Sequence, residues 1–355
     1  MRNLKKQKHK QVKIFDIQRK ADDVKSKVSE YRRRKRMKYY FAPMEGITGY
    51  IYRQVHHQFF TGIDKYFTPF LTPGSKKLMT PKELRDILPE NNKGYNLVPQ
   101  ILTNQAQDFI RLAEELREYG YKEVNLNLGC PSGTVTAKKK GSGFLEFPTQ
   151  LQKFLDEIFE NLDMKISIKT RIGKDEPEEF TELLRVYNQF PLEELIVHPR
   201  IQSDYYKNEP RMEQFQEAVK CSQNSLCYNG DLFTEEKCEN FFKEYPTIDK
   251  VMLGRGLLVN PALAEQVQNG KVLEKTTLKA FHDKLCEEYT EIMSGDKNAL
   301  FKMKELWFYM GNLLVDNQKY LKKIKKSQHL DEYQAIVEEM FQVCPLEIKG
   351  MSHER

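Results

Sequence analysis

The stretch Asn125-Leu-Asn-Leu-Gly-Cys-Pro131 decides how the middle of this chain folds. Its leucines alternate with its asparagines, and in a strand this alternation places the apolar side chains on one face and the amides on the other. Gly129 and Pro131 then end the strand in a sharp turn. Cys130 is therefore held at the end of a strand, where a thiol with an ordinary pKa of about 8.5 is better suited to donate a proton than to act as a nucleophile. Alternatively, Cys130 is a small buried residue that only packs.

The composition is that of a chain with a large core and no membrane-spanning segment. The chain has 355 residues, of which 39% are hydrophobic and 30% charged, and a barrel of about 250 residues with a smaller domain would account for this length. No apolar run approaches the roughly 20 residues that a membrane-spanning helix needs, and the polar N-terminus lacks the apolar core of a secretory signal. The six cysteines contain no C-x-x-C pair. We therefore expect a reduced, cytoplasmic protein without a structural metal, membrane association or an obligate protein partner.

The positive charge is concentrated at the N-terminus. Residues 1–38 hold 16 Lys and Arg against 4 Asp and Glu, a net charge of +12, so the other residues carry −6 of the total of +6. The five cations of Arg32–Arg36 form the kind of cluster that meets phosphates, and the other interpretation is a solvated charge run. A second basic segment, Lys319–Lys326, is either another such cluster or an exposed helix face.

From Tyr39 onward, short apolar runs alternate with longer segments of helical period, which is typical of alternating strands and helices. Eight such units predict an α/β fold, a (β/α)8 TIM barrel. An open doubly wound sheet is the alternative, but the first strand is not followed by the G-x-G-x-x-G phosphate loop that would favour it. The expected strands are 39–44, 64–69, 96–101, 123–128, 165–170, 194–198, 225–229 and 250–253, and the expected helices include 104–119, 149–161, 178–189 and 234–244.

The alternation stops after Pro261. From Thr276 to about Met340 the apolar residues recur at spacings of three and four, which predicts a helical bundle. We therefore expect three parts, namely a basic arm at 1–38, a barrel at 39–270 and a smaller all-helical C-terminal domain at 271–355.

The residues that end the predicted strands are polar, and in a barrel these ends form the active site. Asn229-Gly-Asp231 and Gly254-Arg-Gly256 follow the seventh and eighth strands, where barrels commonly hold a phosphoryl group, although the first is also an ordinary turn sequence. Lys169 on the fifth strand would be a buried or half-buried cation that needs an anion or an electron-rich ring. An ion pair with a carboxylate, or the Schiff-base chemistry of an aldolase, would also account for it. His198 on the sixth strand is either a donor to a cofactor carbonyl or a packed histidine.

Taken together, these strand ends resemble the motifs of the tRNA-dihydrouridine synthase family, flavin enzymes that reduce the 5,6 double bond of uridine in RNA. The resemblance covers residues 39–264 as a barrel and continues more weakly into the helical region. The motifs stand in family order: A-P-M-x-G-[IV]-T at Ala42–Thr48, N-x-N-x-G-C-P-S at Asn125–Ser132, Lys-Lys-Gly-Ser-Gly-Phe-Leu at Lys139–Leu145, Ile-Lys-Thr-Arg at Ile168–Arg171, His-x-Arg at His198, Asn-Gly-Asp at Asn229 and Met-x-Gly-Arg-Gly at Met252.

The resemblance implies a cofactor, a reductant and a general acid. FMN would be reduced by NADPH and would give a hydride from its N5 atom to C6 of uracil, while Cys130 protonates C5. Asn127 would touch both flavin and uracil, Arg171 and Arg200 would contact the substrate, and the helical domain and basic arm would bind the tRNA by shape and charge. The residues implied to bind FMN are Pro43, Met44, Gln100, Lys169, His198, Asn229, Gly230, Asp231, Gly254 and Arg255.

Three alternatives stay open beside this interpretation. An FMN barrel acting on a free pyrimidine such as dihydroorotate would share the cofactor but would not need the helical domain. The same reduction on ribosomal RNA, or an RNA-binding barrel without catalysis, would keep the basic segments. Two positions depart from the family pattern: Gly49 stands where Asp is more frequent, and Pro199 stands where Gly or Ala is more frequent.

Overall fold

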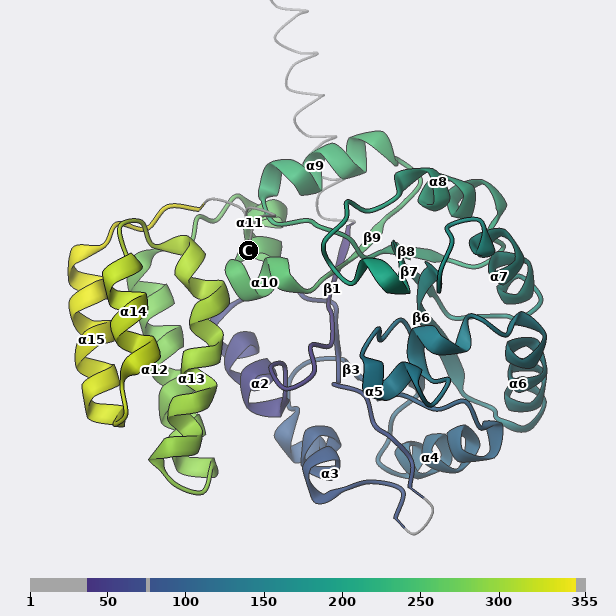
Figure 1. The fold of residues 1–355 in the computed structure, drawn as a ribbon, viewed down its shortest axis with the longest axis horizontal. Coiled ribbons are helices and arrows are strands. Elements are labelled where there is room, and N and C mark those ends of the chain that lie inside the picture. Colours follow the sequence, from purple (N-terminus) through teal and green to yellow (C-terminus); the bar gives the residue numbers. More distant parts are fainter. Residues whose placement is uncertain (1–36, 75–76, 349–355) are drawn as a thin grey trace, which may run out of the picture.

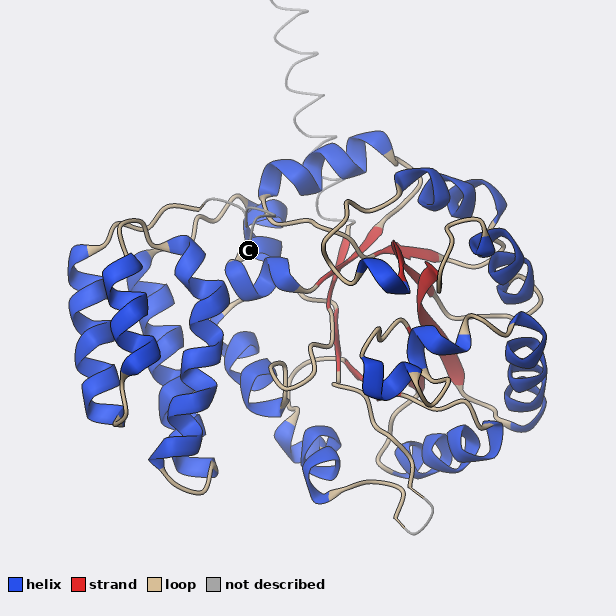
Figure 2. Ribbon diagram, viewed as in Figure 1, coloured by secondary structure: helices blue, strands red, loops and turns tan. Residues whose placement is uncertain are grey.

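A computed structural model describes residues 37–74 and 77–348 as a ring of parallel strands surrounded by helices (Figures 1 and 2). The strand order is β3-β2-β1-β9-β8-β7-β6-β5-β4, and every pair is parallel. Because β1 pairs with both β2 and β9, the first and last strands are neighbours, and the open-sheet alternative is wrong. The strands are β1 (Lys38–Phe41), β2 (Lys65–Phe67), β3 (Leu97–Val98), β4 (Gln100–Ile101), β5 (Glu123–Leu128), β6 (Lys165–Gly173), β7 (Leu195–Ile201), β8 (Leu226–Tyr228) and β9 (Lys250–Leu253).

The predicted strand 96–101 is divided into β3 and β4 by Pro99. Proline has no N–H and cannot donate to a strand ladder, so β3 pairs with β2 while β4 pairs with β5 on the other side. The carbonyl of Pro99 still accepts a hydrogen bond from the N–H of Asn125 at 2.9 Å. Residues 97–101 therefore connect the two ends of the strand order. The eight-unit TIM barrel predicted from the sequence is confirmed.

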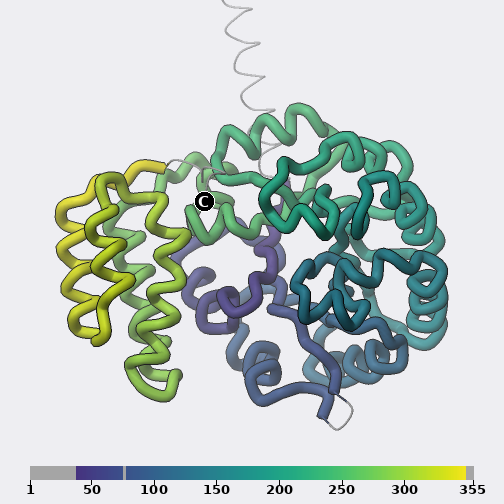
Figure 3. The backbone as a smooth tube through the Cα atoms, viewed as in Figure 1, coloured from purple at the N-terminus to yellow at the C-terminus, as the bar shows by residue number. Residues whose placement is uncertain are grey.

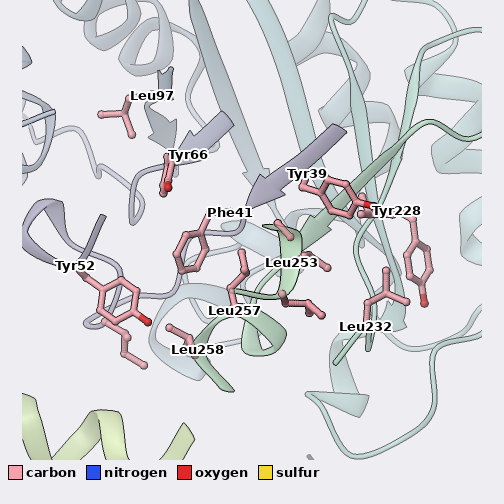
Figure 4. Packing of buried hydrophobic residues seen from close by; sticks show 14 of the residues in the cluster. Tyr39, Phe41, Tyr52, Tyr66, Leu97, Tyr228, Leu232, Leu253, Leu257 and Leu258 are labelled. Carbon is pink, nitrogen blue, oxygen red and sulfur yellow. The ribbon is translucent and has the colours of Figure 1, made fainter. Parts of the chain in front are cut away.

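Helices cover the outside of the strands, and the core lies between these two layers. Figure 4 shows Phe41 and Tyr66 of neighbouring strands beside Tyr52 and Leu257 of the surrounding helices. The helices of the barrel are α2 (Tyr50–Phe59), α3 (Pro81–Ile87), α4 (Ala106–Glu118), α5 (Gly133–Thr136), α6 (Pro148–Asn161), α7 (Glu179–Tyr187), α8 (Met212–Cys221), α9 (Glu235–Glu244), α10 (Arg255–Val259) and α11 (Leu263–Asn269), with 3-10 turns η1 (Pro89–Asn91), η2 (Gly141–Phe144) and η3 (Gln202–Asp204).

The alternation in β5 has the consequence predicted for it. Leu126 and Leu128 are fully buried in the large core between strands and helices. Asn125 and Asn127 lie on the other face, inside the ring, where they form hydrogen bonds with polar side chains of the neighbouring strands. The interior of the barrel is therefore polar near the ends of the strands.

The C-terminal region is all helical and stands beside the barrel (Figure 3). Its helix α12 packs against α2, and α13 packs against α10. The predicted three-and-four spacing is confirmed, since Leu278, Phe281, Leu285 and Tyr289 all lie on the buried side of α12. In the part of the chain that the structure describes, no helix is long and apolar enough to cross a membrane. The elements are α12 (Lys275–Ile292), α13 (Asp296–Met310), η4 (Gly311–Leu313), α14 (Gln318–Lys326) and α15 (Leu330–Val343).

Of the two basic segments, one lies outside the described residues. The described chain begins at Met37, so the run Arg32–Arg36 precedes it. The segment Lys319–Lys326 coincides with α14, whose Tyr320 and Ile324 are buried while most of its lysines face outward. The exposed-helix-face interpretation therefore describes its structure.

The loop after β1 explains the departure at Gly49. Gly49 begins α2 without a side-chain cap, and the carboxylate of Asp86 on α3 accepts the hydrogen bond from the N–H of Tyr50 at 2.7 Å. A Cβ atom at Gly49 would lie 3.2 Å from the same carboxylate oxygen. Asp86 of α3 therefore supplies a carboxylate that accepts a hydrogen bond from the first turn of α2.

Candidate active site

Two adjoining pockets open at the C-terminal ends of the strands, and they share Pro43, Met44, Lys169, His198 and Tyr206. Each pocket has its own further predicted residues. The first is also lined by Asn229, Gly230, Asp231, Gly254 and Arg255, and the second by Gln100, Asn127 and Cys130. The structure thus brings all the residues implied to bind FMN, the implied general acid and Asn127 to one end of the barrel. Arg171 and Arg200 lie close by but line neither pocket.

A chain of amides fixes the orientation of Asn127. Asn125 donates to Ser167 at 2.9 Å and accepts from Gln100 at 2.8 Å, and Asn127 donates to the other end of the Gln100 side chain at 2.7 Å. The carbonyl oxygen of Asn127 accepts from the backbone N–H groups of Gly129 and Cys130, both at 3.0 Å. Asn127 therefore holds the turn that carries the cysteine, while its amide faces the pocket.

Cys130 is half-buried, and its thiol is kept protonated. Burial raises its pKa above the ordinary value, and the opposing effects of the Ser132 backbone, Arg171 and Lys169 do not cancel this. At neutral pH the group is thus a thiol, as a proton donor requires. Of the two interpretations of Cys130, this environment favours the proton donor, because the cysteine lines an open pocket.

The loop after α5 packs directly against the backbone of Cys130. The carbonyl of Cys130 accepts from the N–H and the hydroxyl of Ser142, at 3.1 and 2.9 Å. Gly141 has φ of +57°, and a Cβ there would come within 2.7 Å of the same carbonyl oxygen. This close approach accounts for the glycine in the segment Lys139–Leu145.

Lys169 and His198 stand among cations. Burial and the neighbouring Arg171 lower the pKa of Lys169 to about 8, and the lysine forms no ion pair with a carboxylate of residues 37–74 or 77–348. Burial, followed by Arg171, Lys169, Arg200 and Arg255, holds the pKa of His198 well below its usual value. The ion-pair interpretation of Lys169 is therefore not supported within these residues, and His198 is neutral.

The tautomer of His198 follows from its contact with Arg200. The guanidinium of Arg200 lies 3.0 Å from Nε2 of His198. A guanidinium can only donate hydrogen bonds, so Nε2 accepts and the proton of the neutral ring resides on Nδ1. His198 consequently has one N–H group, on Nδ1, available as a donor.

The two arginines predicted to contact substrate are fully buried and bind the protein itself. Arg171 donates to the carbonyls of Gly129, Ile201 and Tyr205 at 2.7 to 2.9 Å. Arg200 forms an ion pair with Asp231 and donates to the backbone of the loop after β7. In this structure they join that loop to the end of β5 and to Asp231, and their contact with substrate stays a prediction.

Tyr206 is a site residue that the sequence reasoning missed. It lies in the loop after β7, lines both pockets and is 42% exposed. Its ring stacks on His198 at a centroid distance of 5.9 Å, and the guanidiniums of Arg255 and Arg171 lie 4.7 and 5.5 Å from its centroid. The adjacent tyrosines at 205 and 206, within a polar segment directly after a strand, were the signal available in the sequence.

Tyr309 was also missed, and it comes from the helical domain. It lies in the last turn of α13 and lines the pocket that contains Cys130. Nothing local in the sequence marks it, because only the packing of α13 against the barrel brings it to the strand ends. The pocket is therefore built by both parts of the chain.

In the first pocket, where the sequence predicts a phosphoryl group, Asp231 holds the cationic side chains in position. Its carboxylate pairs with Arg200 and with Arg255, the latter from the start of α10. The side chain of Asn229 donates to the carbonyl of Met252 at 2.7 Å and so ties the end of β8 to β9. A Cβ at Gly230 would lie 1.9 Å from the hydroxyl oxygen of Tyr228, so this position has room only for glycine. Among the described residues, no group of three His, Cys, Asp or Glu side chains is placed to hold a metal ion.

Comparison with known proteins identifies the family. The family model for dihydrouridine synthases matches residues 40–344. The chain belongs to the dihydrouridine synthase family. It is therefore an oxidoreductase, and the family resemblance seen in its sequence motifs is confirmed.

Relatives of this dihydrouridine synthase come from several bacteria. The tRNA-dihydrouridine synthase B of Pasteurella multocida is 24% identical over 71% of this chain and 74% of its own length. A probable tRNA-dihydrouridine synthase of Staphylococcus epidermidis is 26% identical over 70% of this chain and 77% of its own length. A solved structure of morphinone reductase in complex with tetrahydroNAD resembles 67% of this chain and 88% of that chain at 13% identity, with a TM-score of 0.46, which is too low to support an argument.

Proposed function

We propose that this protein is an FMN-dependent tRNA-dihydrouridine synthase that uses NADPH to reduce the 5,6 double bond of uridine in tRNA. The observation that carries the proposal is the pocket in which Cys130, Asn127, Lys169 and His198 meet. The names of the bacterial relatives support tRNA as the substrate. When bound, FMN would supply the hydride that is added to C6 of the uracil.

The charges around the two pockets fit an anionic cofactor. Lys169, Arg171, Arg200 and Arg255 all act on His198, whereas Asp231 is the carboxylate that pairs with Arg200 and Arg255. The excess of positive charge would be balanced by the phosphate of FMN near Arg255 and by the negative charge of the reduced ring near Lys169. The implied FMN residues Pro43, Met44, Gln100, Asn229, Gly230 and Gly254 would form the walls of this cradle.

Side chains of the pocket would donate the proton and orient the uracil and the cofactor. Cys130, kept as a thiol, would give its proton to C5 of the uracil, and Asn127, held by Gln100, would orient the pyrimidine ring. The Nδ1–H of His198 would donate to a cofactor carbonyl. Arg171 and Arg200 would contact the substrate only after exchanging some of their present backbone partners, and otherwise would hold the loop that carries Tyr206.

Recognition of tRNA would involve both parts of the chain. A uridine within folded RNA must be flipped out to reach the pocket. We assign the barrel at 39–270 to FMN and the helical domain at 271–355, with the lysines of α14, to the RNA backbone. The basic arm 1–38 would add a further contact, and the cytoplasm is the compartment that such a substrate implies. Because Tyr309 of the helical domain lines the pocket, a free pyrimidine is the less favoured substrate.

The test begins with the cofactor. The purified protein should show a flavin absorption spectrum, and a colourless preparation that takes up no FMN would refute the proposal. The flavin-loaded enzyme is then given NADPH with unmodified tRNA, with ribosomal RNA or with a free pyrimidine, and the products are examined by mass spectrometry for the gain of two hydrogens. We expect product only with tRNA. Product with ribosomal RNA or with a free pyrimidine alone would support one of the alternatives, and RNA binding without turnover would indicate a barrel that lacks catalysis.

A further inference from the structure

A third cavity lies at the seam between the barrel and the helical domain. Its walls come from the loop after β1, from α2 and α3 of the barrel, and from the end of α12 and the start of α13. It shares Ile47 and Pro69 with the pocket that contains Cys130. The two spaces therefore adjoin at the loops that follow β1 and β2.

The lining of this seam cavity is partly apolar and partly polar. Tyr50, Ile51, Tyr289, Ile292 and Met293 supply aromatic and aliphatic surface. Two small polar side chains complete the lining on the helical side, Ser294 and Asn298. Such a lining suits a flat heteroaromatic base, which needs apolar contact on its faces and a few hydrogen bonds at its edge.

Three cations stand on the rim of the seam cavity: Lys82, Arg85 and Lys302. Lys82 lies 3.4 Å from Glu45, and Lys302 lies 2.9 Å from Glu305 and donates to the carbonyl of Gly46.

Arg85 differs from the two lysines. Its guanidinium acts on the phenol of Tyr50, and it forms no ion pair with any residue that the structure describes. The carboxylate of the adjacent Asp86 is already engaged by the N–H of Tyr50. An exposed guanidinium beside an apolar recess is suited to a phosphate group.

We propose that the seam cavity binds the adenosine 2′-phosphate end of NADPH, with the base against the apolar side chains of its lining and the phosphomonoester at Arg85 and Lys82. The inference rests on the proposed function, since it places the reductant of that reaction. NADPH gives up one hydride from its nicotinamide ring and leaves as NADP⁺, so the nicotinamide must reach the pocket of Cys130 and Lys169. Because the two cavities share Ile47 and Pro69, one dinucleotide would extend from the seam cavity to the pocket of Cys130.

The same phosphate chemistry could also serve an RNA backbone, which carries phosphodiesters. A phosphomonoester has up to two negative charges, whereas a phosphodiester has one, and Arg85 and Lys82 place two cations at the cavity. These features favour the nucleotide. They also define probes that distinguish the two sources, namely 2′,5′-ADP, 5′-AMP and tRNA.

The binding experiment uses the full-length, flavin-loaded enzyme and equilibrium calorimetry. Arg85→Ala should weaken binding of 2′,5′-ADP by about tenfold, the loss expected for one charge-assisted contact to phosphate, and should change binding of 5′-AMP by about twofold or less. Arg85→Lys should keep part of the affinity. Arg185→Ala is the matched control, because Arg185 is an exposed arginine that pairs with Glu182, and its helix α7 lies across the barrel from α2 and α12 (Figure 1).

A second measurement separates this inference from the proposed function. The flavin is reduced with dithionite instead of NADPH, and its reoxidation by unmodified tRNA is followed. The flavin of Arg85→Ala should be reoxidised by tRNA at the wild-type rate. Its reduction by NADPH should require a higher NADPH concentration than in the wild type. Unchanged affinity for 2′,5′-ADP in Arg85→Ala would overturn the inference, and a loss of tRNA affinity alone would reassign the cations to RNA. A wild-type enzyme that reduces no uridine even after dithionite treatment would refute the proposed function whatever the cavity binds.

Discussion

Raising the pH should release FMN from this enzyme, and Lys169 is the reason. In the structure its pKa is lowered to about 8, because burial and Arg171 disfavour the ammonium form. The ring of oxidised FMN is neutral, but its hydrogen-bond acceptor atoms beside the ammonium group would stabilise the charged form and restore the pKa, so binding of FMN is expected to be accompanied by proton uptake. Affinity should therefore be highest below pH 8 and should fall as pH rises through 8. Affinity falls with rising pH whenever the pKa of a group is lower in the free protein than in the complex, because the free protein then loses its proton first.

The size of the effect follows from the same value. With a pKa of about 8, Lys169 is nearly all charged at pH 7 and about one-tenth charged at pH 9. If the lysine stays charged in the complex, FMN binding weakens about tenfold between these two pH values. The phosphate of FMN does not contribute, because its second pKa, about 6, lies below this range.

The assay is a fluorescence titration of flavin-free protein with FMN at pH 7, 8 and 9. Lys169→Met provides the control, since it should bind FMN weakly at every pH and show no slope. Calorimetry in buffers of different ionisation enthalpy measures the proton uptake directly. A wild-type affinity that is constant from pH 7 to 9, or a slope that survives in Lys169→Met, would show that the Lys169 ammonium group does not contact the bound FMN.

Three further changes test other parts of the reasoning. Cys130→Ala should keep FMN and tRNA binding but slow the oxidation of reduced flavin by tRNA about 10²- to 10⁴-fold, and an unchanged rate in single-turnover kinetics would place the acid elsewhere. Asp86→Ala should lower the free energy of unfolding by about 1–2 kcal/mol through loss of the cap on Tyr50. The double variant Asp86→Ala with Gly49→Asp should recover part of the lost free energy of unfolding in urea denaturation. No recovery would show that a carboxylate at position 49 cannot replace that of Asp86. Tyr309→Ala should raise the KM for tRNA while leaving NADPH-dependent flavin reduction unchanged in stopped-flow measurements, whereas equal loss in both steps would indicate a purely structural role.

The barrel was predictable because its signals are local. The alternation in β5 and the short apolar runs with helices between them depend only on neighbouring residues, and they predict all the strands within a few residues. The division at Pro99 could also have been anticipated from its missing N–H. The sequence pattern does not indicate that β3 and β4 pair with strands on opposite sides, because this pairing depends on the closure of the whole ring.

The site was predictable to the extent that its residues follow strands. Cys130 follows β5, and Lys169 and His198 lie at the ends of the predicted strands 165–170 and 194–198, although β6 and β7 continue to Gly173 and Ile201. The barrel hypothesis alone therefore places them together. Tyr206 and Tyr309 depend instead on the path of a loop and on the docking of a helix from another domain. Neither position can be read from periodicity, because each contact joins segments that are distant in the sequence.

Arg171 and Arg200 show why a motif does not by itself assign a role. Arg171 lies within β6 and Arg200 within β7, near the C-terminal end of each strand, yet their guanidiniums are occupied by backbone carbonyls and by Asp231. A buried guanidinium that left these partners would lose several charge-assisted hydrogen bonds at once, so exchanging them for a substrate must be compensated by equally good contacts. Because Arg171 joins the turn of Cys130 to the loop of Tyr206, a ligand that displaces either element also acts on the other. Arg171 therefore couples the position of Cys130 to that of the loop that carries Tyr206, even if Arg171 contacts no substrate.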